Sequence, residues 1–272
     1  MWSFREYLCF FLIYAFLGWC CEVVYAAAMH GKFVNRGFLN GPVCPVYGFG
    51  VCLVVFVLYP IKENLLALFL GSMLLTSAIE LVAGYLMEKC FHHRWWDYSK
   101  RPLNIGGYVC LLFSLLWGLA CVLVIDVAHP LVAKLVSLIP VNLTVILLAV
   151  LYAVLLADLV VTVLCVLKLN RRLRKLDEAA ERLRVVSDSV GESLAEGTIA
   201  VKKRNEAFRA ALREHKPGFG ERRLLKAFPD IRSERYAEAM QELKRRLLGE
   251  NKDAKAAEAA QRNAEQAAEN KD

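Results

Sequence analysis

The sequence predicts an all-α protein, a polytopic membrane helix bundle of about five spans with a helical cytoplasmic tail. Three observations predict it: 57% of the 272 residues are hydrophobic, apolar runs of membrane length recur, and charge is unevenly distributed. Residues 1–168 contain only 10 of the 34 Lys and Arg residues and 8 of the 27 Asp and Glu residues. We therefore expect a membrane domain over 1–168, a helical, coiled-coil-like cytoplasmic tail over 169–249 and a disordered end over 250–272.

Five segments are long and apolar enough to cross a bilayer as helices. Their approximate limits are 6–28, 42–60, 64–88, 104–128 and 141–168. The second segment is short and opens with Pro42 and Pro45, so we expect irregular backbone at its start. Such backbone is stable at membrane depth only where protein or water shields it.

Positive charge predicts the orientation, because loops rich in Lys and Arg stay in the cytoplasm. Basic residues cluster in the stretches after the first, third and fifth segments, whereas the opposite side holds only Arg5, Lys62 and Lys134. We therefore expect a multi-pass protein of the cell membrane, with its N-terminus outside and its C-terminus cytoplasmic. Membrane lipid is the expected partner of the apolar segments.

Two acids lie inside apolar segments of membrane length, and an arginine follows each of them fourteen positions later. Glu22 is followed by Arg36, and Glu80 by Arg94. An acid at the centre of a membrane helix costs roughly 2.5–3.5 kcal/mol on insertion scales. The repeated arrangement indicates a duplicated hairpin, and it favours a functional role over the alternative of protonated packing residues.

Further polar residues lie on the same predicted inner side. Asp158 is a third acid within an apolar segment, and two loops between segments are rich in Asn, Arg and Gly. We expect one polar cluster that lines a substrate path or forms a polar core. Its candidates are Glu22, Glu80, Asp158, Asn35, Arg36, Asn40, Arg94, Asp97 and Asn104. The alternative is that each arginine is structural and pairs with Asp97 or with a membrane acid.

The two loops also resemble a known family. The strings GKFVNRGFLNGPVCPVYGFG and RWWDYSKRPLNIGGYVCLLFSLLWG, with the preceding GWCCE and AIELVAGYLMEK, are similar to the type IV ABC-transporter permease family over roughly residues 5–165. The resemblance implies a permease subunit of unknown substrate. The chain contains no GxxxxGK[ST] phosphate loop, so a separate ATPase subunit is implied.

The sequence does not predict an enzyme, a cofactor or a metal site. All nine cysteines precede residue 169 without zinc spacing, and His129 is interpreted as a flanking residue rather than a ligand. No nucleophile–base pair is evident, so a membrane enzyme acting on a lipid-linked phosphate ranks third among the functions. The tail's mixed charges do not indicate nucleic-acid binding.

The tail begins with a heptad pattern that includes Leu169, Leu173 and Leu176. This pattern favours self-association into a homo-oligomer or docking on a partner, and an amphipathic helix resting on lipid headgroups is an equal alternative. The sequence KPGFG at 216–220 interrupts the helix, and Ser233 is a candidate N-cap for a later one. The tail therefore supports a second hypothesis, a non-transport scaffold or regulator.

Overall fold

A computed structural model describes residues 2–31, 33–190, 218–233, 235–241 and 243–245. It divides into two units, Met1–Val166 and Leu167–Asp272. The described residues are almost entirely helical, with four strands of two residues each. The expected disorder of 250–272 and the later part of the heptad pattern lie outside these residues. The all-α prediction is confirmed.

Two long helices open the two hairpins of the first unit. α1 (Phe4–His30) starts at Ser3, whose side chain and that of Glu6 form a capping box. α3 (Leu65–Phe91) starts at Asn64, whose side chain accepts a hydrogen bond from Ala67 N. Each helix has 27 residues, which is long enough to cross a bilayer.

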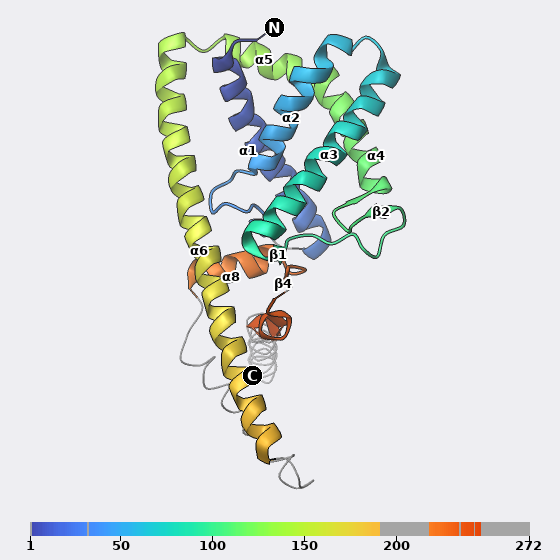
Figure 1. The fold of residues 1–272 in the computed structure, drawn as a ribbon. Coiled ribbons are helices and arrows are strands. Elements are labelled where there is room, and N and C mark those ends of the chain that lie inside the picture. The colour runs from blue at the N-terminus through green and yellow to red at the C-terminus, as the bar shows by residue number, and fades with distance from the viewer. Residues whose placement is uncertain (1, 32, 191–217, 234, 242, 246–272) are drawn as a thin grey trace, which may run out of the picture. The chain divides into compact units, whose positions relative to one another are not determined.

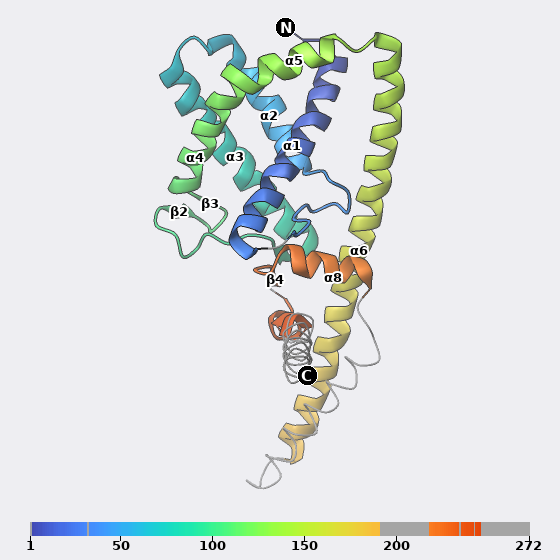
Figure 2. The same cartoon turned by 180° about the vertical axis from the view of Figure 1, so that it is seen from behind.

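The second predicted segment forms a shorter helix, preceded by non-helical backbone. α2 (Pro45–Leu58) continues into the 3-10 turn η1 (Tyr59–Ile61). The amide of Cys44, the residue before α2, donates to the carbonyl of Ala15 at 2.9 Å. Because Ala15 lies near the middle of α1, the chain runs back alongside α1 before α2 begins; Figures 1 and 2 show this stretch between α1 and α6.

The fourth predicted segment starts later than expected. Strands β2 (Asn104–Ile105) and β3 (Val109–Cys110) pair in an antiparallel hairpin, and α4 (Leu111–Leu123) follows. The turn between the strands contains Gly106 and Gly107, whose positive φ angles of 60° and 76° interrupt any helix. This is why the helix begins at residue 111 rather than at 104. The short strand β1 (His93–Arg94) lies earlier in the same loop.

After α4 the helix changes direction. A π-helical turn, η2 (Val124–Ala128), leads into α5 (His129–Ser137), which has a proline in its first turn. π-turns and prolines are the usual causes of a sharp bend. α5 accordingly lies across one end of the α1–α4 hairpins in both views (Figures 1 and 2).

The last apolar segment belongs to a single helix of 50 residues, α6 (Val141–Val190), which extends from the first unit into the second. Leu169, Leu173 and Leu176, the first members of the heptad pattern, are buried. The second unit also contains α8 (Phe219–Ala227) and β4 (Arg232–Ser233). Ser233 Oγ accepts a hydrogen bond from Tyr236 N at 3.2 Å, the i to i+3 bond of a capping residue.

The apolar helices are suited to a membrane. Among the described residues, four helices are long and apolar enough to cross one, namely Phe4–Met29, Leu65–Phe91, Leu111–Ser137 and Val141–Glu178, and Pro45–Ile61 is a shorter apolar helix. α1 packs mainly on α2, and α3 on α4. Many of the outward-facing side chains are large and apolar, including Leu74, Leu86 and Val160. These side chains are suited to contact with lipid.

Candidate polar site in the membrane part

Glu22 on α1 has the partners that an acid at membrane depth requires. Arg36 Nε lies 3.3 Å from Glu22 Oε2. Tyr47 on α2 donates its hydroxyl to Glu22 Oε1 at 2.7 Å. The Arg36 guanidinium also lies over the ring of Tyr25, 5.2 Å from its centroid. The first acid–arginine pair expected from the sequence therefore exists, and a tyrosine completes it.

A glycine brings Tyr47 within reach of Glu22. Gly18 lies one turn before Glu22 on α1, and a Cβ built on it would be 2.3 Å from Tyr47 Cγ. Only a residue without a side chain permits this approach of α1 and α2. The ring of Tyr47 also contacts Trp117 of α4 edge-on, at 5.7 Å between centroids, so it lies between the two hairpins.

Glu80 on α3 has different surroundings. Tyr98, in the loop between α3 and α4, donates its hydroxyl to Glu80 Oε1 at 3.3 Å, and its ring stacks on Phe113. Burial holds the pKa of the Tyr98 phenol well above its usual range, and the nearby carboxyl groups of Glu80 and, more weakly, Glu22 act in the same direction. Glu22 and Glu80 therefore lie within electrostatic range of one tyrosine.

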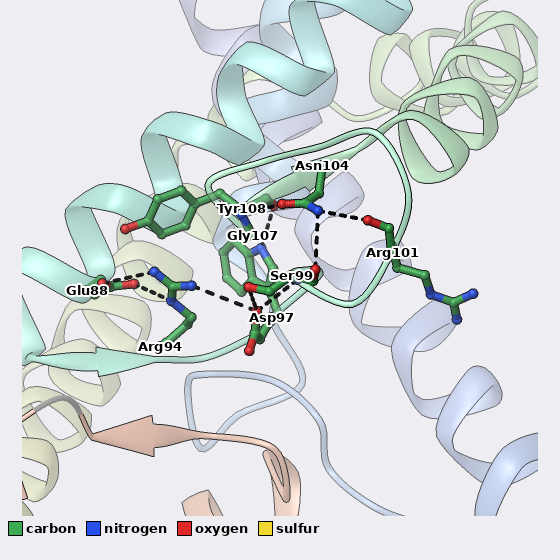
Figure 3. Close-up of polar contacts among 9 residues, drawn as sticks. Glu88, Arg94, Asp97, Ser99, Arg101, Asn104, Gly107 and Tyr108 are labelled. Atoms are coloured by element: carbon green, nitrogen blue, oxygen red, sulfur yellow. Dashed lines mark hydrogen bonds and ion pairs between the residues drawn. The ribbon is translucent and has the colours of Figure 1, made fainter. Parts of the chain in front are cut away.

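Arg94 does not pair with Glu80. Its Nε and Nη2 donate to the two carboxylate oxygens of Glu88 at 2.8 and 3.3 Å. Its Nη1 lies 3.8 Å from Asp97 Oδ1, and its guanidinium lies 4.9 Å from the centroid of the Tyr108 ring (Figure 3). Hydrogen bonding to Glu88 raises the pKa of Arg94 further, so the side chain stays charged. This environment corresponds to the structural alternative for Arg94.

The loop around Arg94 is closely packed. A Cβ on Gly107, whose φ is positive, would lie 2.5 Å from Ser99 Oγ and 2.9 Å from Arg94 Nη1. Asp97 Oδ1 accepts from both the amide and the hydroxyl of Ser99. Asn104 donates to the carbonyl of Arg101 and accepts from Gly107 N (Figure 3). Asp97 and Asn104 therefore hold this loop in its fold.

Asp158 on α6 binds the non-helical stretch before α2, residues 35–44, which we call the loop segment. Asp158 Oδ1 accepts from the amide and the side chain of Asn40 at 3.1 and 2.8 Å, and Oδ2 accepts from Gly41 N at 2.7 Å. Thr162, one turn along α6, accepts from the Asn40 side chain at 2.9 Å. Asp158 lies about 25 Å along α6 from its start at Val141, by the helical rise per residue. Asp158 therefore stabilises irregular backbone at membrane depth.

Asn35 organises the other end of the loop segment. Its side-chain oxygen accepts from Trp19 Nε1 of α1 at 2.8 Å and from Gly37 N at 3.2 Å. Its amide group donates to the carbonyl of Asn40 at 2.7 Å. The loop segment is therefore held from α1 through Trp19 and from α6 through Asp158.

The nine candidates form several groups of contacts rather than one. Glu22 pairs with Arg36; Asn35 and Asn40 act with Asp158; Glu80 bonds a tyrosine; and Arg94, Asp97 and Asn104 belong to the α3–α4 loop. The loop segment links the first two groups, because it carries Arg36, Asn35 and Asn40. Tyr98 links the third group to the first, because it bonds Glu80 and lies within electrostatic range of Glu22. The α3–α4 loop group has its own internal partners.

Sequence reasoning missed several partners. The sequence did not predict a role for Tyr47 or Glu88. Tyr47 could have been noticed as a residue with a polar hydroxyl within the apolar run PVYGFG. His129, interpreted as a flanking residue, is fully buried, and its Nδ1 lies 2.9 Å from the Tyr14 hydroxyl. The bend at η2 turns His129 toward α1, and residue spacing does not reveal such a bend.

The site's chemistry is that of charge and hydrogen bonding. Within the part of the chain that the structure describes, no group of three or more His, Cys, Asp or Glu residues is placed to hold a metal ion. What the site presents is a carboxylate–guanidinium pair, a second carboxyl group and a polar loop. Such groups can bind a polar solute or stabilise the packing of the helices.

Comparison with known families agrees with the resemblance noted in the two loops. Residues 9–163 match the family described as "Putative ABC-transporter type IV". The match covers more than half of the 272 residues, and the chain belongs to this family. None of the curated proteins and none of the solved structures compared matches it. The family and the apolar helices together define a multi-pass membrane protein related to ABC transporters.

Proposed function

We propose that this chain is the permease subunit of an ABC-type transporter and works with a separate ATPase subunit. Family membership supports a transport role, and the sequence has no phosphate loop with which to hydrolyse ATP. The distribution of basic residues supports an orientation with the N-terminus outside and the C-terminus cytoplasmic.

The observation that carries the proposal is the loop segment. Non-helical backbone at membrane depth is tolerated where it is shielded by protein or lines a polar cavity, and transporters place substrate sites at such breaks. The segment carries Asn35, Arg36 and Asn40, and the acids Glu22 and Asp158 hold it on two sides. It is therefore our candidate for the moving part of a solute path.

The test is to purify the chain with its native partners in a mild detergent and to reconstitute the complex in lipid nanodiscs. We expect an ATP-hydrolysing subunit to co-purify in fixed proportion. We also expect Asn40→Ala to change its ATPase rate, whereas Asp126→Asn, at an exposed acid without a hydrogen-bond or ion-pair partner in the described part of the chain, should not. A complex without ATPase activity would refute the transporter assignment.

A scaffold or regulator that acts through the tail is the second candidate. The observation that favours it is the continuity of α6, since one helix carries Asp158 and the start of the tail. A scaffold or regulator of this kind would self-associate through its tail helix. Deleting residues 169–272 separates the two functions: unchanged ATPase stimulation and solute movement in the truncated protein would exclude a tail-centred role.

A further inference from the structure

Glu22 and Glu80, the two acids of the repeated arrangement, differ in whether a cation lies beside them. Glu22 lies 3.3 Å from the guanidinium of Arg36 and accepts a second bond from Tyr47. Glu80 makes no ion pair among the residues described, and the hydrogen bond from Tyr98 reaches only one of its oxygens. Its other oxygen, Oε2, is buried and has no hydrogen-bond partner within the described chain.

The arginine that the sequence repeat offers to Glu80 is already occupied. Arg94 binds both oxygens of Glu88, near the end of α3, and lies near Asp97 in the loop that follows. No Lys, Arg or His side chain is among the groups that act on the nearby Tyr98 phenol. Within the described part of the chain, no cation is therefore paired with Glu80 to offset an ionised carboxylate.

An ionised carboxylate in such a place is far more costly than a neutral carboxylic acid, because burial penalises the charged form and no ion pair compensates it. We propose that Glu80 is a proton-binding site in the membrane part of this protein, with the proton on the buried oxygen Oε2 and the Tyr98 hydroxyl bonded to the other oxygen. The counterpart Glu22 is paired with Arg36.

The position of Tyr98 gives this site access to water. Tyr98 belongs to the α3–α4 loop, and the next two residues, Ser99 and Lys100, are exposed. The α3–α4 loop is therefore the side from which we expect Glu80 to exchange its proton with water. The inference goes beyond the proposed transport function and does not depend on an ATPase partner.

Dicyclohexylcarbodiimide, which reacts with protonated carboxyl groups in apolar surroundings, tests the proposal on the full-length protein in an ester-free maltoside detergent. Peptide mass spectrometry should find the adduct on Glu80 and not on Glu22, and labelling should fall as the pH is raised. Arg36→Gln is the internal control: once its cation is removed, Glu22 should become labelled too. Equal labelling of Glu22 and Glu80 in the unmodified chain, or labelling of Glu22 alone in the Arg36→Gln variant, would overturn the proposal.

Infrared spectroscopy supplies a measurement that does not depend on access of the reagent. The unmodified protein should show the C=O stretch of a protonated carboxylic acid, shifted in D₂O and lost in Glu80→Gln but retained in Glu22→Gln. A spectrum without that band would refute the proposal, whatever the carbodiimide labelling shows. Protection of Glu80 from labelling by Na⁺ but not by choline would show that a metal cation is bound instead, which also contradicts the proposal.

Discussion

At the scale of single residues, the acids on the membrane helices differ in what neutralises them. Glu22 is paired with an arginine, Asp158 accepts hydrogen bonds from two backbone amides and two side chains, and Glu80 bonds a single phenol. Three acids in similar apolar stretches of the sequence therefore have three different sets of partners. Each of them makes a separate prediction for substitution by the uncharged amide.

For Glu22, a double-mutant cycle with Arg36 should detect pairing. We expect Glu22→Gln and Arg36→Gln each to lower the thermal unfolding midpoint. The double variant should lose less unfolding free energy than the two single variants together, and the difference should be about 0.5–3 kcal/mol. The readout is intrinsic tryptophan fluorescence on heating. The same cycle on Glu80 and Arg94 is the matched control, and its losses should add because Arg94 binds Glu88 instead. Additive losses at Glu22 and Arg36 would refute their pairing.

For Asp158, replacement by Asn should destabilise the loop segment. The new side chain retains one acceptor oxygen and turns an amide donor toward Asn40 or Gly41, whose amides are donors themselves. We expect a loss of about 1–3 kcal/mol of unfolding free energy, the cost of leaving buried polar groups unpaired. Asp126→Asn makes the same chemical change at an exposed position and should have no effect. Equal behaviour of the two variants would contradict the role given to Asp158.

At the scale of helices, the close approach of α1 and α2 sets the geometry of the first hairpin. It depends on Gly18, since the added methyl group of alanine would overlap the fixed part of the Tyr47 side chain rather than a flexible end. The approach lets Tyr47 reach Glu22, so a packing contact between helices and a polar contact in the site depend on the same residue.

Gly18→Ala should therefore lower stability by about 1–3 kcal/mol, the usual cost of overpacking. The variant should also weaken the bond between Tyr47 and Glu22. Gly50→Ala is the control on α2, because a Cβ there has nothing within 4 Å. That variant should unfold at the temperature of the parent or slightly above it, since alanine is the better helix former. Thermal unfolding of the two variants side by side decides the matter.

At the scale of the whole molecule, α6 is the element that joins the membrane part to the tail. It begins at Val141, carries Asp158 and Thr162, and ends at Val190. The hydrogen bonds that Asp158 and Thr162 make with the loop segment lie within the membrane part.

A chain truncated after residue 168 should accordingly insert in the membrane and keep the contacts of the loop segment. We expect Asp158→Asn to destabilise the truncated and the full-length chain by the same amount, measured by thermal unfolding in detergent. Truncation after residue 152 removes Asp158 and should give a less stable, polydisperse protein on gel filtration. A membrane part that aggregates after truncation at 168 would show that its fold requires the tail.

The apolar segments and their order could be read from the sequence because they depend on local properties. A run of apolar residues is stable in lipid wherever it lies, and a charge within it is costly whatever its neighbours are. Each of the five predicted segments overlaps an apolar helix of the structure. The family resemblance carried by the two loops was confirmed by the match over residues 9–163.

Which polar groups meet depends on where helices end and loops turn, and the sequence does not show these points. Asn40 and Asp158 are 118 residues apart in the chain. The equal spacing of the two acid–arginine pairs is also misleading, because Glu80 lies about 16 Å along α3 from the helix end at Phe91, and Arg94 follows that end after only two residues. Arg94 consequently meets Glu88 near the end of α3, whereas Arg36, on a segment that folds back along α1, reaches Glu22.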